Sequence, residues 1–114
     1  MQITIVDDAG AIAKVTLNGK LDISGAEKIA LPLATLAGGK SGILLDMTEV
    51  SFLASIGIRH LVAASKALAR RGGRLVLLNP NPMVTDVLTT SGVVELLPIA
   101  RSDAEAAAAL GTQA

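Results

Sequence analysis

The sequence predicts a single α/β domain over residues 1–114, with a mixed central sheet of about five strands and four helices. Short apolar segments of strand length alternate with longer amphipathic segments of helix length. The first two predicted strands follow each other without a helix between them, so we expect a hairpin. The later alternation of strands and helices implies parallel crossovers.

The composition indicates an aliphatic core and excludes several classes of function. Hydrophobic residues make up 51% of the chain, but it has one Phe and no Trp, Tyr or Cys. Ten basic and ten acidic residues give a net charge of zero, which argues against a nucleic-acid partner. No stretch approaches the roughly 20 apolar residues that cross a bilayer, and the first residues lack a secretory signal pattern. We therefore expect a cytoplasmic protein without membrane insertion.

The opening segment predicts a β-hairpin. Residues 2–6 and 11–17 both alternate in polarity, and the polar residues 7–10 between them are typical of a turn. Asn18-Gly19 is a candidate for a further hairpin turn. Residues 20–23 favour a corner from a strand into a helix instead.

The first helix is predicted from a capping pattern. Ser24 and Glu27 have the spacing of a capping box, so the helix is expected to begin there and to end at Gly38-Gly39. Pro32 lies inside this span, where proline costs on the order of 3 kcal/mol. The helix is therefore expected either to kink at Pro32 or to break into two segments.

The rest of the chain repeats the alternation of strand and helix. Residues 42–47 are predicted to form a buried strand, followed by a loop and a helix for which Ser55 is the N-cap. The later elements are a strand at 74–78, a helix with Asn81 as cap and Pro82 at its first position, a weak strand at 94–97, and a helix at 103–110 opened by Ser102 and Glu105.

No set of catalytic or metal-binding residues is expected, and no cofactor. His60 is the one histidine in the chain. Ser55 lies five residues before it, which is about 140° around a helix, so the two side chains do not face each other as a nucleophile and its base. The sequence therefore predicts a protein that is not an enzyme.

Two carboxylates near the ends of predicted strands have structural interpretations. Asp22 is expected to satisfy backbone groups at the corner where it lies. Asp46 ends an apolar strand, where an unpaired charge is costly, so we expect it to accept hydrogen bonds from the following loop, with Thr48 as the donor.

Ser55 has two interpretations. A serine at a helix start is commonly a cap, but a cap usually follows polar residues, and here Leu53 and Ala54 precede it and Ile56 follows. These apolar residues either pack into the core or present an apolar surface to a partner. The sequence does not separate these two possibilities.

Two segments resemble the STAS domain family, whose bacterial members include the anti-sigma factor antagonists. The first is Gly19-Lys20-Leu21-Asp22, and the second runs from Leu45-Asp46-Met47-Thr48 to Ser55-Ile56-Gly57-Ile58-Arg59. Many antagonists carry an aspartate directly before the serine of this motif, whereas this chain has Ala54. The resemblance extends over nearly the whole chain and implies a STAS-like fold.

The resemblance implies a regulatory switch. In the family, an anti-sigma factor that is also a serine kinase phosphorylates the serine at the helix start, and a phosphatase resets the switch. Ser55 matches that serine, and the implied function is an anti-sigma factor antagonist in transcription regulation. The implied partner-binding residues are Asp22, Leu53, Ala54, Ser55, Ile56 and Gly57, with Asp46 and Thr48 as structural support. The alternative is a STAS subunit that docks on the ATPase of an ABC-type lipid transport complex.

Overall fold

The computed structural model describes residues 1–6 and 10–111, and within them the predicted order of elements is confirmed. The predicted turn at 7–10 lies mostly outside the described residues. The elements are β1 (Gln2–Val6), β2 (Ile12–Leu21), α1 (Ile23–Gly39), β3 (Gly42–Leu53), α2 (Ser55–Ala69), β4 (Arg74–Leu78), α3 (Pro82–Thr90), β5 (Ile99–Ala100) and α4 (Asp103–Leu110).

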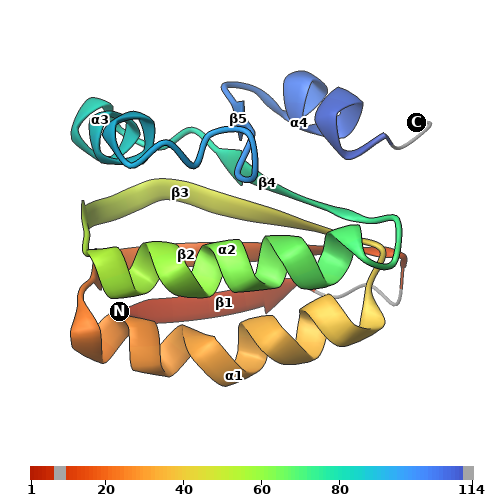
Figure 1. Ribbon diagram of the computed structural model, residues 1–114, viewed down its shortest axis with the longest axis horizontal. Coiled ribbons are helices and arrows are strands. Elements are labelled where there is room, and N and C mark those ends of the chain that lie inside the picture. Colours follow the sequence, from red (N-terminus) through yellow and green to blue (C-terminus); the bar gives the residue numbers. More distant parts are fainter. Residues whose placement is uncertain (7–9, 112–114) are drawn as a thin grey trace.

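The five strands form one mixed sheet in the order β1-β2-β3-β4-β5. β1 pairs with β2 in antiparallel fashion, and the other neighbours are parallel. Figure 1 shows α1 and α2 side by side on one side of the sheet, with α3, α4 and β5 on the other side of β3. The predicted α/β fold with an opening hairpin is therefore correct.

Alternating side chains of the central strands enter two cores. The larger core lies between the sheet and the helices α1 and α2, and it also receives Val84 and Leu88 of α3. The smaller core lies under α4, where Val76 and Leu78 of β4 meet Ala106. Both cores are aliphatic, as the composition predicts. The strand residues of the larger core are Ala13, Val15, Leu17, Leu21, Ile43, Leu45, Met47, Val50, Leu53, Leu75 and Leu77.

β2 and β3 are both longer than predicted. β2 continues through Asn18-Gly19, so these residues form no hairpin turn, and β3 continues six residues beyond the predicted end at Met47. The two strands pair as far as Leu21 and Leu53, with register shifts on either side of Asn18-Gly19. These irregularities change the spacing of buried residues in β3, which hides the strand from a search for strict alternation.

α1 begins at a different cap from the predicted one. The Asp22 carboxylate accepts a hydrogen bond from the N–H of Gly25 at 2.9 Å, so Asp22 is the N-cap and Ser24 lies inside the helix. The helix runs without a break through Pro32. Because Ile29 and Leu33 on either side of Pro32 are buried in the core, packing holds the helix together despite the missing N–H.

The last strand is also displaced from its predicted place. Residues 93–97 form a turn in which the N–H of Leu97 donates to the carbonyl of Val93, and β5 follows at Ile99–Ala100. The caps of the last two helices are confirmed, since the side chain of Asn81 accepts from Val84 and that of Ser102 from Glu105.

Arg71 joins the ends of the two helices on the same face of the sheet. Its guanidinium donates to the carbonyls of Ala37 and Lys40, both at 2.8 Å, at the C-terminal end of α1. These carbonyls have no acceptor role within the helix, and the cation also lies at the negative end of the α1 dipole. Arg71, which follows α2 in sequence, therefore caps the C-terminal end of α1.

Replacing Arg71 by Met should lower the free energy of unfolding by about 1 to 2 kcal/mol, because two charged hydrogen bonds are lost while the aliphatic part of the side chain remains. Urea unfolding followed by circular dichroism measures this change. Arg70→Met is the matched control, since Arg70 is exposed and should change stability by less than about 0.5 kcal/mol. Equal effects of the two substitutions would contradict the capping role.

Candidate functional site

The candidate site lies where β2 and β3 end next to each other. Leu21 and Leu53 are paired as the last residues of the two strands, and the N–H of Ala54 donates to the carbonyl of Leu21 at 2.9 Å. Because α1 and α2 follow these strands directly, the two helices begin side by side (Figure 1). Asp22 and Ser55 are thereby brought to one edge of the molecule.

Ser55 is the first residue of α2, whereas the sequence predicted it as the N-cap. Ala54 occupies the cap position with extended backbone angles, and no side chain makes a capping hydrogen bond there. The shift by one residue follows from β3, which continues to Leu53 and leaves only Ala54 as the connection. The Ser55 side chain is therefore exposed and is not committed to the helix cap.

The start of α2 differs from the starts of the other helices in the described chain. Side chains of Asp22, Asn81 and Ser102 cap α1, α3 and α4, whereas Ala54 offers no acceptor atom. The first N–H groups of a helix have no acceptor within the helix itself. At α2 these donors are therefore left for water or for a ligand.

The residues implied as a partner surface differ in their exposure. Ser55 is exposed, while Asp22, Ala54 and Ile56 are half-buried. Leu53 is only 4% exposed, and Gly57 is also buried. Four of these residues can therefore touch a partner, and Leu53 and Gly57 support them from within the core.

Gly57 allows α2 to approach the end of β2. A Cβ atom at this position would lie 2.7 Å from the Cγ atom of Leu21 and 3.2 Å from its carbonyl oxygen. No side chain fits there without displacing Leu21, so the glycine sets the distance between helix and strand. Its role is to place Ser55.

Three exposed apolar residues at the start of α1, the end of β3 and the start of α3 were not predicted as part of the site. Ile23 is 69% exposed, Phe52 44% and Met83 53%. Phe52 is the one aromatic residue of the chain, and as the neighbour of buried Leu53 in β3 it points to the other side of the sheet. The sequence signal that could have pointed to this surface is an aromatic residue three positions before Ser55.

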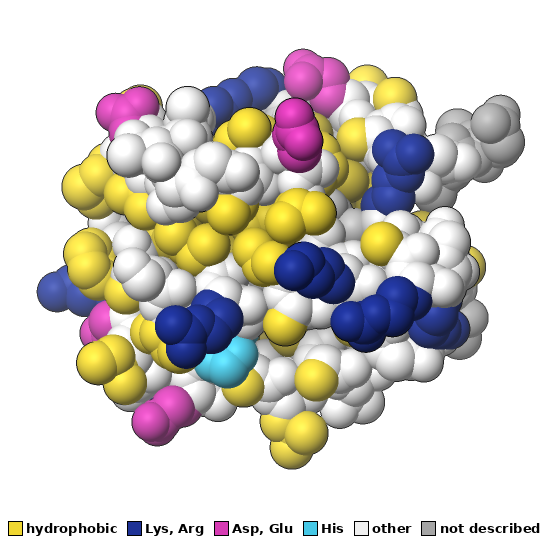
Figure 2. Space-filling view, viewed as in Figure 1, with side chains coloured by type: hydrophobic (Ala, Val, Ile, Leu, Met, Phe, Trp, Pro, Cys, Tyr) yellow, Lys and Arg dark blue, Asp and Glu magenta, His cyan; other side chains and the backbone are white. Residues whose placement is uncertain are grey.

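We define the Ser55 edge as the exposed or half-buried residues Ile23, Phe52, Ser55, Ile56 and Met83, which lie at the starts of α1, α2 and α3 and at the end of β3. Figure 2 shows hydrophobic side chains at this end of the molecule, interspersed with charged and other side chains. Exposed apolar side chains at the ends of neighbouring elements are candidates for contact with another protein.

Asp46 and Thr48 stabilise the strand that leads to Ser55. One carboxylate oxygen of Asp46 accepts from the N–H of Thr48 at 3.0 Å and from its hydroxyl at 2.6 Å, as was expected. Asp46 does not end the strand, however. It is the last residue of β3 that pairs with β4, opposite Leu78, and β3 continues beyond it.

Asn81 forms a hydrogen bond to the part of β3 beyond Asp46, which no longer pairs with β4. Its side-chain oxygen caps α3 by accepting from Val84 at 2.8 Å, and its side-chain nitrogen donates to the carbonyl of Val50 at 3.0 Å. One amide group therefore fixes both the start of α3 and the strand that carries Phe52. The sequence showed only the first of these two roles.

His60 lies one helical turn after Ile56 and about 140° around α2 from Ser55. It lines a shallow groove of about 140 Å³ between α1 and α2, among alanine side chains. In the part of the chain that the structure describes, no three His, Cys, Asp or Glu residues are grouped so that they would hold a metal ion. Within that same part, the helices are too short or too polar to cross a membrane.

Gly57→Ala should lower the free energy of unfolding by about 1 to 3 kcal/mol, because the new methyl group would overlap with Leu21. The measurement is thermal or urea unfolding. Gly38→Ala is the control, since a Cβ atom there meets nothing within 4 Å. That variant should be as stable as the wild type or more stable by up to about 1 kcal/mol. A neutral Gly57→Ala would show that the helix start is less closely packed.

Ala54→Asp should raise the free energy of unfolding by about 0.5 to 2 kcal/mol, because the carboxylate would accept from a free N–H group of the first turn and face the positive end of the helix dipole. Urea unfolding measures the gain. Ala63→Asp, at an exposed position inside α2, should give no gain. Stabilisation by both substitutions would indicate a general charge effect and not a cap.

Comparison with known proteins identifies the family. The STAS domain family model matches residues 2–106. BtrV of Bordetella bronchiseptica, a protein assigned to the anti-sigma factor antagonists, is 32% identical over 97 residues, which cover 84% of each chain.

Two solved structures of the Bacillus anti-sigma factor antagonist SpoIIAA share the fold. The unphosphorylated form has a TM-score of 0.82 at 23% identity and covers 99% of this chain and 100% of its own. The phosphorylated form has a TM-score of 0.73 at 24% identity, with coverage of 95% and 98%. These likenesses confirm the arrangement of strands and helices. The family model and the identity with BtrV show that the chain belongs to the STAS domain family.

Proposed function

We propose that the protein is a non-enzymatic, cytoplasmic anti-sigma factor antagonist that binds an anti-sigma factor through the Ser55 edge. In this proposal the partner is also a serine kinase, phosphorylation of Ser55 ends the complex, and a phosphatase restores it. The observation that carries the proposal is an exposed serine at the uncapped start of α2, with the exposed apolar residues Phe52 and Ile23 at the end of β3 and the start of α1. The similarity to BtrV supports the same role.

The position of Ser55 suits a kinase substrate. A serine that caps its own helix uses its hydroxyl oxygen to accept a backbone hydrogen bond, whereas Ser55 lies one residue inside the helix and is exposed. His60 lines the groove between α1 and α2 and lies about 140° around the helix from Ser55, so it does not face the hydroxyl as a base. These features support the serine as the acceptor of a phosphate and not as a nucleophile.

The start of α2 can accommodate a phosphate. A phosphate adds about −1.5 to −2 charges at pH 7, and it would face free N–H groups and the positive end of the helix dipole. No acidic side chain lies in the first turn of α2 to repel it. Ala54 makes no side-chain hydrogen bond to the first N–H groups of α2, so these donors stay available to the phosphate. The fold should therefore persist after modification.

The cost of phosphorylation would fall on binding. A partner that covers Ile23, Phe52 and Met83 would also have to remove water from a dianion at Ser55. A loss of about 3 kcal/mol weakens an affinity roughly a hundredfold. Docking on the ATPase of a transport complex would use the same apolar side chains but gives no role to the exposed hydroxyl.

Ser55→Asp should weaken binding to the anti-sigma factor by roughly tenfold to a hundredfold, because a carboxylate is introduced into the apolar contact. Its free energy of unfolding should stay at or slightly above that of the wild type, since an acidic residue in the first turn favours the helix. Isothermal titration calorimetry with the candidate kinase encoded nearest to this gene measures the affinity.

Two controls separate a local effect from a general charge effect. Ser55→Ala should bind like the wild type, and so should Ser91→Asp, which adds the same charge at the far end of α3. Incubation with the kinase and ATP should place one phosphate on Ser55, as detected by mass spectrometry, and none on Ser55→Ala. Undiminished affinity of Ser55→Asp, or phosphate only at other residues, would refute the proposed switch.

A further inference from the structure

Arg59 lies one helical turn after Ser55 on the same side of α2. The two residues are four positions apart in the helix, which places them about 40° apart around its axis and about 6 Å apart along it. Because the Cα–Cβ bonds of a helix tilt toward its N-terminus, the side chain of Arg59 extends back toward the first turn. The guanidinium is therefore within reach of a group attached to the Ser55 oxygen.

The Arg59 guanidinium is not used by the fold. Its side chain is exposed, and among the residues that the structure describes it forms no ion pair or side-chain hydrogen bond. Arg71 differs in this respect, since its guanidinium donates to two carbonyls at the end of α1. The 15 residues of α2 include no Asp or Glu, so no carboxylate of the same helix competes for Arg59.

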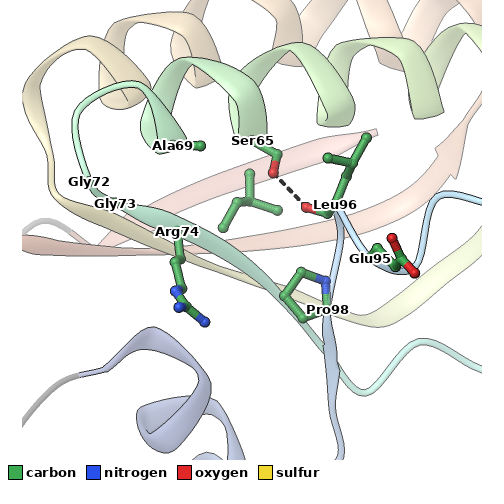
Figure 3. A pocket seen from close by; sticks show the side chains of 9 residues that line it. Ser65, Ala69, Gly72, Gly73, Arg74, Glu95, Leu96 and Pro98 are labelled. Carbon is green, nitrogen blue, oxygen red and sulfur yellow. Dashed lines mark hydrogen bonds between the residues drawn. The ribbon is translucent and has the colours of Figure 1, made fainter.

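Ser65, the other serine of α2, has the opposite surroundings. Its side chain is only 7% exposed, and its hydroxyl donates to the carbonyl of Leu96 (Figure 3). The residue four positions after it is Ala69, which carries no charge. Of the two serines in this helix, Ser55 is therefore the one that combines an accessible hydroxyl with a cation in the following turn.

Other charged side chains around the start of α2 are differently placed. Lys20 pairs in register with Phe52, so it lies on the face of the sheet away from α2. The carboxylate of Asp22 accepts from the N–H of Gly25, and His60 lies about 140° around α2 from Ser55. The remaining charged side chains of α1, β3 and β4 are Glu27, Lys28, Asp46, Glu49 and Arg74.

We propose that Arg59 pairs with a phosphate on Ser55 and holds it against the first turn of α2. This inference rests on the proposed phosphorylation of Ser55. An acidic group four residues before a basic one is the favourable order in a helix, and phosphate oxygens match the planar guanidinium. The pair adds a side-chain contact to the backbone donors of the first turn, so the modified serine is fixed at the helix start.

The pair changes the charge state of the phosphate. The second ionisation of a phosphoserine has a pKa of about 6. A guanidinium close to the phosphate favours its dianion over its monoanion and therefore lowers this pKa. With Arg59 in place, the modified serine keeps its full charge as the pH falls toward about 6. Without Arg59, part of that charge is lost in the same pH range.

The test uses the full chain with phosphoserine introduced at position 55 during translation, so that no kinase is needed. Phosphorus-31 NMR as a function of pH measures the pKa of the phosphate. Arg59→Gln should raise that pKa by about 0.3 to 0.8, and Arg59→Lys, which keeps the charge, by less than about 0.3. Lys66→Gln is the matched control, because it removes the same charge about 16 Å from Ser55 on the same side of α2. This control should change the pKa by less than about 0.1, since salt screens charges at that distance.

Thermal unfolding verifies that each variant is folded and supplies a second readout. Phosphoserine at position 55 should raise the midpoint of unfolding by more in the parent chain than in Arg59→Gln, and an equal rise in both would overturn the pairing. An unchanged phosphate pKa in Arg59→Gln would overturn it too, as would an equal change in Lys66→Gln, which would indicate a general charge effect. Failure of a kinase to modify Ser55 would refute the proposed function and leave this measurement intact.

Discussion

The extended pairing of β2 with β3 positions both helices that begin at the Ser55 edge. The two strands remain together as far as Leu21 and Leu53, and the hydrogen bond from Ala54 to Leu21 closes their ends. Gly57 then lets α2 pack directly on Leu21. Because α1 and α2 both start from this junction, Asp22 and Ser55 are held at one edge by strand pairing and not by a flexible loop.

This construction leaves the Ser55 hydroxyl accessible at the start of α2. A serine at the end of a loop would have capped the helix, but the longer strand moves the cap to Ala54 and places the serine in the first turn. The hydroxyl is then exposed and the helix donors beside it are free. Asn81 bonds to the same strand along the edge that β4 has left, and Asp46 and Thr48 bond to each other within the strand.

The first turn of α2 combines an exposed hydroxyl with backbone donors that no side chain caps. Ser55 is exposed, and Ala54 makes no capping hydrogen bond. Under the proposed function, a charge added at this serine would weaken the docking of a partner while the helix start remains intact.

The sequence by itself determined the order of the elements, the aliphatic core and the caps at Asn81 and Ser102, because these depend on residues close together in the chain. The tertiary structure decided where β2 and β3 end, since a neighbouring strand extends each beyond its local pattern. It also made Asp22 and Ala54 the caps, because strand ends set where the helices can begin. The exposure of Phe52 and the burial of Leu53 depend on the same pairing, which no local pattern contains.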